Sequence, residues 1–171
     1  MNWWPEVWTT VQREFSDLAD ATQITQICVR LSVAVLLGGL LGYERERSGS
    51  AAGLRTHMMV AVGAALFVIA PLQAGMSLDD LSRVLQGIIA GIGFLGAGAI
   101  IKLSDKEEIK GLTTAASIWA TAAVGTAAGM GREMTAILST AFALVILAVL
   151  PRLEKRIQTS KRRVETVISK E

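Results

Sequence analysis

Five long apolar runs, separated by short charged islands, dominate the pattern of hydrophobic and polar positions along the chain. They cover roughly residues 24–43, 58–72, 84–101, 111–130 and 134–150. A helix rises about 1.5 Å per residue, so about 20 apolar residues cross the roughly 30 Å apolar core of a bilayer. The pattern therefore predicts an all-α polytopic membrane helix bundle with five transmembrane helices, forming one domain over residues 24–151, with the lipid bilayer as its surroundings.

The first segment, residues 1–23, is amphipathic instead of continuously apolar. Trp4, Trp8, Val11 and Phe15 recur at helical spacing, and the charged residues fall largely on the other side. Three of the four tryptophans of the chain lie in this segment, and tryptophan favours the membrane interface. The segment is expected to form either an interfacial helix lying on the membrane surface or a helix folded against the bundle.

The run Val84–Ile101 carries no formal charge and contains five glycines. A helix with so many glycines is poorly stabilised by its own side chains, so close contact with other helices is expected to hold it. We therefore expect the other spans to pack around this run. Small-xxx-small pairs also occur in the first and fourth spans, and the predicted packing glycines are Gly38, Gly42, Gly87, Gly91, Gly93, Gly96, Gly98, Gly125 and Gly129.

Basic residues alternate between the two sides of the predicted spans. The segments after the first and third spans each hold three, whereas the segments after the second and fourth hold one arginine each. Residues 152–171 hold seven basic and three acidic residues, which predicts a basic cytoplasmic tail suited to an anionic membrane surface, a partner or simple solvation. The positive-inside rule then places the N-terminus outside and the C-terminus in the cytoplasm.

Two single residues in the first span stand out. Arg30 is an intramembrane charge that either extends to the interface or faces the protein interior with a partner. Cys28 is the only cysteine, which excludes a disulfide within the chain, and we expect it to be a small buried apolar side chain.

The residue types that catalysis and metal binding require are scarce. His57 is the only histidine, and the five apolar runs contain no Asp or Glu. We therefore expect no enzyme activity, no catalytic residue, no metal site and no resident cofactor, and we expect no nucleic-acid partner. Backbone carbonyls of a helix interrupted at glycine could still pass Mg²⁺.

Four short motifs follow one another at the ends of the runs: GYERE at 42–46, AGLRTH at 52–57, GIGFLGAG at 91–98 and GLTTAA at 111–116. In this order they closely resemble the MgtC/SapB family of bacterial membrane proteins, over roughly residues 24–150. The resemblance implies five spans in the bacterial inner membrane. It also implies a role in growth at low magnesium and, in pathogens, in intracellular survival. Many members carry a C-terminal cytoplasmic domain, which we expect this short chain to lack.

The resemblance also favours a shared polar site at the cytoplasmic face over a merely solvated loop. Its predicted members are Glu44, Glu46, Arg47, Arg55, Thr56, His57, Lys102, Thr113 and Thr114. Arg47 and Arg55 are the expected anion binders, and Arg45, in the same run, is expected only to help set the topology.

Three functional hypotheses follow. The first is a non-enzymatic regulator, homodimeric, that acts through another membrane protein such as a P-type cation pump or the ATP synthase. The second is an oligomeric transporter or channel for a divalent cation such as Mg²⁺. The third is a lipid-binding structural protein that uses the tail and the N-terminal helix.

Overall fold

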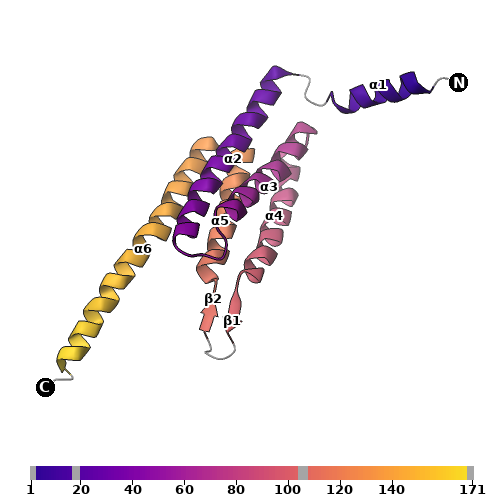
Figure 1. Cartoon of the computed structure of the whole chain (residues 1–171). Helices are drawn as coiled ribbons and strands as arrows, with labels where there is room; N and C mark the ends of the chain where they lie inside the picture. Colours follow the sequence, from indigo (N-terminus) through magenta and orange to yellow (C-terminus); the bar gives the residue numbers. More distant parts are fainter. Residues whose placement is uncertain (1–2, 17–19, 104–107, 169–171) are drawn as a thin grey trace.

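The computed structural model describes residues 3–16, 20–103 and 108–168, with side chains described outside 101–109 and 152–168. Over these residues the chain forms six helices and one small hairpin (Figure 1). The elements are α1 Trp4–Glu14, α2 Ala21–Arg47, α3 Leu54–Gln73, α4 Leu78–Gly98, β1 Ile101–Leu103, β2 Glu108–Lys110, α5 Leu112–Gly129 and α6 Glu133–Ile168. The all-α prediction is confirmed, and the two three-residue antiparallel strands of the hairpin are an addition to it.

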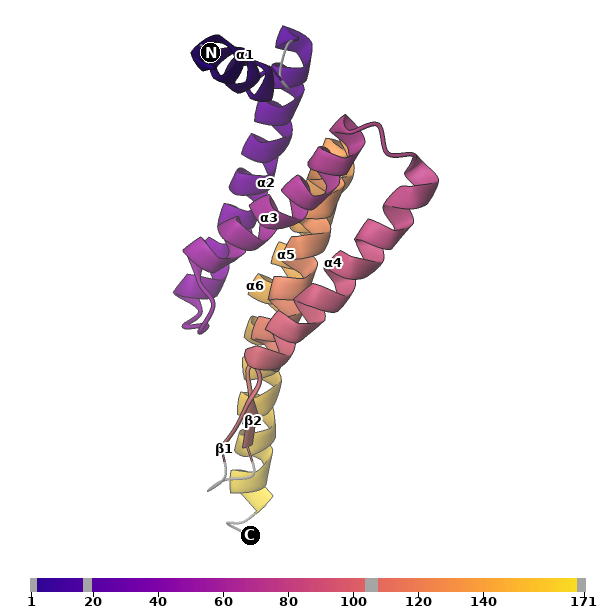
Figure 2. The same ribbon diagram turned by 90° about the vertical axis from the view of Figure 1, so that its right-hand side faces the viewer.

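Helix α5 lies at the centre of the bundle, against α2, α3, α4 and α6 (Figure 2). Nine of its 18 residues are buried, and most of them are Ala, Gly, Ser or Thr. Small side chains let neighbouring backbones approach, which is the main source of helix association in lipid. The fourth predicted span, and not the glycine-rich third, is therefore the helix around which the others pack.

Four glycines place helices α2, α3 and α5 in backbone contact: Gly38, Gly42, Gly125 and Gly129. A Cβ atom added at Gly125 would lie 2.7 Å from the Cα atom of Ala61, and one added at Gly42 would lie 2.7 Å from the Cα atom of Leu54. Both distances are far shorter than a real carbon contact, and backbone atoms cannot rotate away. The structure places these four of the predicted packing glycines in helix interfaces.

Helix α4 lies at the edge of the bundle, and only Leu81 and Gly96 are buried in it. Gly96 is in ordinary contact with the neighbouring helix, 3.7 Å from the Cβ atom of Ala115. The prediction that the other spans pack around Val84–Ile101 is therefore wrong for the single chain. Added Cβ atoms would meet nothing within 4 Å at the remaining predicted packing glycines of this run, Gly87, Gly91, Gly93 and Gly98.

Four helical stretches are long and apolar enough to cross a membrane: α2, α3, α4 and the part of α6 from Glu133 to Pro151. They correspond to four of the five predicted spans. Helix α5, the remaining one, falls outside this group because its sequence is rich in Ala, Gly, Ser and Thr. Other helices surround it, so it needs fewer large apolar side chains on its surface.

Three predicted boundaries differ from the structure. Helix α2 continues to Arg47, so the charged run after Tyr43 forms its last turn instead of a loop. Helix α6 continues through Pro151 to Ile168, well beyond residue 150, where the fifth predicted span ends (Figure 1). The island after Ile101 begins and ends as strands that pair Ile101 with Lys110.

The N-terminal helix α1 has no buried residue, so it does not fold against the bundle in this structure. The prediction of a buried Cys28 is also wrong, since this side chain is exposed on α2. Arg30, two residues later on the same helix, has a protein partner instead. Its Nη1 atom donates a hydrogen bond to the carbonyl oxygen of Gly129, 3.2 Å away, at the last residue of α5. The negative end of the α5 dipole favours a cation there.

We predict that Gly125→Ala destabilises the protein by about 1–3 kcal/mol, because the new methyl group overlaps the backbone of α3 at Ala61. Unfolding in detergent, followed by far-UV circular dichroism, measures the effect. Gly63→Ala is the matched control, since a Cβ atom there meets nothing within 4 Å. This control should be neutral or slightly stabilising, because alanine favours helix over glycine. Equal stability of the two variants would contradict the packing assigned to Gly125.

Candidate functional site

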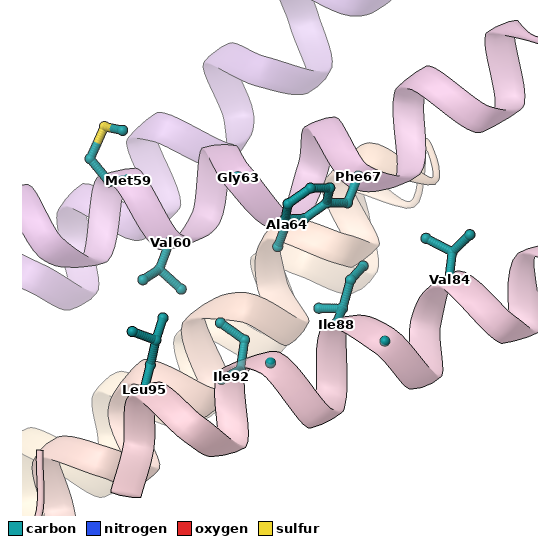
Figure 3. Close-up of a pocket in the computed structure, with 11 residues that line it drawn as sticks. Met59, Val60, Gly63, Ala64, Phe67, Val84, Ile88, Ile92 and Leu95 are labelled. Atoms are coloured by element: carbon teal, nitrogen blue, oxygen red, sulfur yellow. The ribbon is translucent and has the colours of Figure 1, made fainter. Parts of the chain in front are cut away.

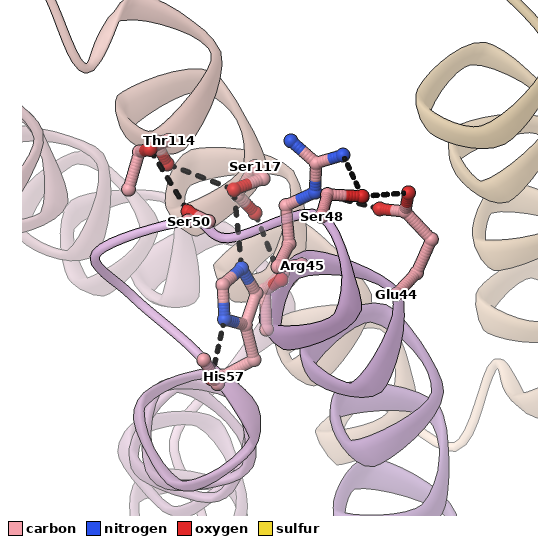
Figure 4. A network of polar contacts seen from close by, with 9 residues as sticks. Glu44, Arg45, Ser48, Ser50, His57, Thr114 and Ser117 are labelled. Atoms are coloured by element: carbon pink, nitrogen blue, oxygen red, sulfur yellow. Dashed lines mark hydrogen bonds and ion pairs between the residues drawn. The ribbon is translucent and has the colours of Figure 1, made fainter. Parts of the chain in front are cut away.

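Polar side chains meet at one end of the bundle, where α2 ends and where α3 and α5 begin (Figure 4). The cluster consists of Glu44, Arg45, Ser48, Ser50, His57, Thr114 and Ser117. Within the described part of the chain, every buried side-chain nitrogen or oxygen has a hydrogen-bond partner. We call these seven residues the polar cluster.

Arg45 is the buried charge of the polar cluster, with an exposed fraction of 6%. Its Nε atom donates to Oε2 of Glu44 at 2.6 Å, and its Nη2 atom lies 3.4 Å from Oγ of Ser48. The Ser48 hydroxyl in turn donates to Oε1 of Glu44 at 2.7 Å. A buried guanidinium needs a counter-charge and hydrogen bonds to offset its desolvation, and Glu44 and Ser48 provide both.

His57 is fully buried and joins α3 to α5. Its Nδ1 atom lies 2.9 Å from the carbonyl oxygen of Gly53, and its Nε2 atom lies 3.1 Å from Oγ of Ser117. A carbonyl only accepts, so Nδ1 carries a proton, and in the neutral ring Nε2 accepts from the Ser117 hydroxyl. That hydroxyl also lies 2.8 Å from the carbonyl oxygen of Thr114. Its single proton therefore serves one of two acceptors at a time.

A second polar link ties the segment after α2 to the first turn of α5. The hydroxyl oxygens of Ser50 and Thr114 are 2.9 Å apart, and either can donate. Gly111, immediately before α5, has a left-handed backbone with φ of +94°. A Cβ atom there would also collide with the carbonyl group of Ala99, just after α4. This position requires glycine on both grounds, which explains the first residue of the GLTTAA motif.

Two of the sequence motifs meet at the start of α3. The N-cap residue Gly53 has no side chain to accept from the helix backbone. Glu46 replaces it, because its Oε2 atom accepts from the N–H of Leu54 at 2.8 Å. A Cβ atom at Gly53 would lie 2.8 Å from the same carboxylate oxygen. The GYERE motif thus caps the helix that the AGLRTH motif begins.

The structure divides the predicted site residues into two groups. Glu44, His57 and Thr114 are in the polar cluster, and Glu46 lies beside it at the N-terminus of α3. The backbone of Lys102 lies in β1, and its side chain is outside the described part. The others are exposed and form none of the hydrogen bonds of the polar cluster: Arg47, Arg55, Thr56 and Thr113.

The sequence analysis left four members of the polar cluster out of the predicted site: Arg45, Ser48, Ser50 and Ser117. Helical periodicity could have identified Arg45. It follows Leu41 by four positions and Gly38 by seven, so it continues the buried stripe of α2. Reading the charged run as a loop hid this relation. Ser117 shares a buried face of α5 with Thr114 and Thr121, but its partner on α3 is set by tertiary packing.

Among the residues that the structure describes, no three His, Cys, Asp or Glu side chains are grouped so that they could hold a metal ion. The arrangement is instead a set of hydrogen bonds and one ion pair that fixes three helices at one end. The fold and this site define a multi-pass helical membrane protein in which the polar cluster lies where α2, α3 and α5 meet.

The chain belongs to the MgtC family, which matches residues 31–156. This confirms the resemblance drawn from the four motifs. It is similar to Protein SrpB of Synechococcus elongatus, with 43% identity over 137 residues, 74% of this chain and 75% of that protein. No solved structure matches the chain.

Two further relatives are longer than the region they share with this chain. "Putative magnesium transporter YhiD" of Escherichia coli is 39% identical over 77% of this chain and 64% of its own length. Protein MgtC of Brucella abortus is 46% identical over 70% of this chain, and the match spans 49% of that protein. The residues that match the MgtC family, 31–156, contain the whole polar cluster.

We predict that Arg45→Gln lowers the free energy of unfolding by about 1.5–3 kcal/mol, because it removes hydrogen bonds to a partly buried carboxylate. Arg47→Gln, two residues later on the same helix, should change it by less than about 0.5 kcal/mol, since Arg47 is exposed. Denaturant unfolding in detergent compares the two. Equal losses would show that Arg45 contributes no more than a surface arginine.

Proposed function

We propose that this protein is a non-enzymatic regulator in the bacterial inner membrane that supports adaptation to low magnesium by contacting other membrane proteins. A P-type cation pump and the ATP synthase are the candidate partners. The observation that carries the proposal is the contrast between a closed core and an uncovered α4. Helices α2, α3 and α5 touch at the backbone, whereas open glycines lie along α4.

The composition of the core favours a regulator over a path for ions through one chain. Ala34, Ala61, Ala65 and Ala128 are fully buried where the central helices meet. A divalent cation needs oxygen ligands along its path, and intramembrane carboxylates commonly supply them. The apolar runs of this sequence contain no Asp or Glu.

The outer face of α4 is suited to contact with another helix. Gln86, Ala90, Gly93 and Ala97 follow one another at helical spacing, and all four are exposed. Small residues allow a second helix to approach closely, and a glutamine can form a hydrogen bond across the contact. This face supports both a homodimer and the docking of a helix of another membrane protein.

The proposal includes five membrane crossings with the N-terminus outside and the C-terminus in the cytoplasm. Gly125 meets Ala61 and Gly129 meets Ala65, so α5 runs parallel to α3 and beside it. A helix in this position crosses the membrane together with α3, which supports counting α5 as a span. The alternation of basic residues supports this orientation, in which the polar cluster would lie at the cytoplasmic end.

An oligomeric Mg²⁺ transporter or channel is the second candidate. The similarity to the Escherichia coli protein named "Putative magnesium transporter YhiD" favours it. In that case the path would lie between chains, along the uncovered side of α4.

Magnesium flux and growth separate the two candidates. Purified protein in liposomes that contain a magnesium-sensitive dye should give no flux above empty vesicles if the protein is a regulator. In cells lacking the gene, Gly93→Leu should fail to restore growth at low magnesium, because it fills the proposed contact face. Gly93→Ala keeps the face small and should restore growth at equal protein level. Flux in the liposomes would establish the transporter, and rescue by Gly93→Leu would exclude the proposed face.

A crosslinking experiment tests the homodimer. In a Cys28→Ser background, Ala90→Cys should give a disulfide-linked dimer on mild oxidation in membranes, because Ala90 lies on the outer face of α4. The unmodified chain is the control, since its only cysteine lies on α2 and is exposed. Equal dimer yield from both chains, or none from Ala90→Cys, would contradict a dimer formed through α4.

A further inference from the structure

A groove of about 630 Å³ separates α3 from α4 along much of their length (Figure 3). Its walls are hydrocarbon, because every side chain that lines it is apolar. From α3 the lining includes Met59, Gly63 and Phe67, and from α4 it includes Gly87, Gly91 and Leu95.

Glycines keep this groove open. A Cβ atom added at Gly63, Gly87 or Gly91 would meet nothing within 4 Å, so these three positions leave open space in the walls of the groove. The helices are nevertheless held at both ends. The short connection between α3 and α4 joins them at one end, and the contact of Gly96 with Ala115 anchors α4 at the other. These two attachments hold the ends of α4 in place, and the groove lies between them.

Arg55 lies one helical turn before Met59, toward the end of the groove nearest the polar cluster. Arg55, Met59, Gly63 and Phe67 follow one another at intervals of four, so they form one row along α3. The last three line the groove, and Arg55 is the exposed next member of the row. Arg55 also lies in the first turn of α3, where the helix dipole adds positive potential.

The opposite end of the groove has a different charge character. Asp79 and Asp80 lie in the first turn of α4, and Arg83 follows them directly before Val84, which lines the groove there. Two negative charges and one positive charge give this end a net charge of −1. An anionic head is thus favoured at Arg55 over the opposite end, where the two carboxylates outweigh the charge of Arg83.

We propose that this groove binds an acyl chain of an anionic phospholipid, and that Arg55 holds the phosphate. The volume exceeds that of one fatty acyl chain and lies within the range of specific ligand sites. It is too small to enclose a whole helix, which occupies about 2,400 Å³ over a 30 Å length at a diameter of 10 Å. Basic residues at the ends of gaps between transmembrane helices select anionic headgroups. The inference is independent of the proposed regulatory function.

Native mass spectrometry of the full chain in detergent tests the proposal with phosphatidylglycerol and phosphatidylethanolamine of identical acyl chains. The unmodified protein should retain phosphatidylglycerol in preference. Arg55→Gln should lower that retention about fivefold and abolish the preference. Gly87→Leu should lower the retention of both lipids, because a leucine side chain fills the groove. Gly63→Leu fills the same groove from α3 and should have the same effect.

Two matched controls separate the groove from the general surface. Arg47→Gln removes another exposed arginine from the same end of the bundle, outside the row that lines the groove. Gly93→Leu adds the same side chain at an equally open glycine of α4 that does not line the groove. Both should retain phosphatidylglycerol as the unmodified protein does.

Several results would overturn the proposal. Equal retention of the two lipids by the unmodified protein would remove the role of Arg55, as would equal losses in Arg47→Gln and Arg55→Gln. Unchanged retention in both Gly63→Leu and Gly87→Leu, each with an unfolding curve like that of the unmodified protein, would exclude the groove. A dimer mass that replaces the lipid adducts and disappears in Gly87→Leu would assign the groove to a second copy.

Discussion

The backbone contact between α3 and α5 is the interaction on which the rest of the structure depends. In a membrane, apolar side chains gain little by leaving lipid for a helix interface, so close packing and hydrogen bonds must hold the bundle together. Along α3, His57, Ala61 and Ala65 form one row, and along α5, Ser117, Gly125 and Gly129 form the facing row. The same close approach that brings Gly125 onto Ala61 brings the Ser117 hydroxyl to His57. Packing and polar contact are two parts of one interface.

This interface explains why glycines with the same spacing have different roles. Gly125–Gly129 and Gly87–Gly91 are both small-xxx-small pairs, but only the first pair meets another backbone within the chain. The position of α5 in the bundle determines which glycines contact another helix. The four-residue spacing of two glycines does not predict this position. The hydrophobic runs predicted the helices well, because apolar length is a local property. The central position of the fourth run could not be predicted in this way. Its many Ala, Gly, Ser and Thr residues are explained only once the helix is seen to be surrounded by protein.

The polar cluster shows the same limit. Glu44, His57 and Thr114 were predicted because they lie on motifs, and the structure brings them to one end of the bundle. Arg45 was assigned only a topological role, although the period of α2 already places it on the buried stripe below Leu41. Treating four consecutive charges as solvent-exposed obscured that period. The partners of Ser50 and Ser117 were beyond sequence reasoning, because they lie 64 and 60 positions away along the chain.

The first turn of α3 joins the polar cluster to the groove, and its geometry constrains what the groove can influence. Glu46 caps this turn, Gly42 lies against Leu54, and His57 is bonded to Ser117. With α2 and α5 both attached, the turn cannot shift without breaking contacts at the backbone. Arg55 is on the exposed side of the same turn. A ligand held by Arg55 would therefore contact α3 as a fixed wall of the groove. The other wall is α4, which has few contacts with the core and is the element able to move. Occupancy of the groove would therefore change the position of α4, and with it the position of the outer face that contains Gly93.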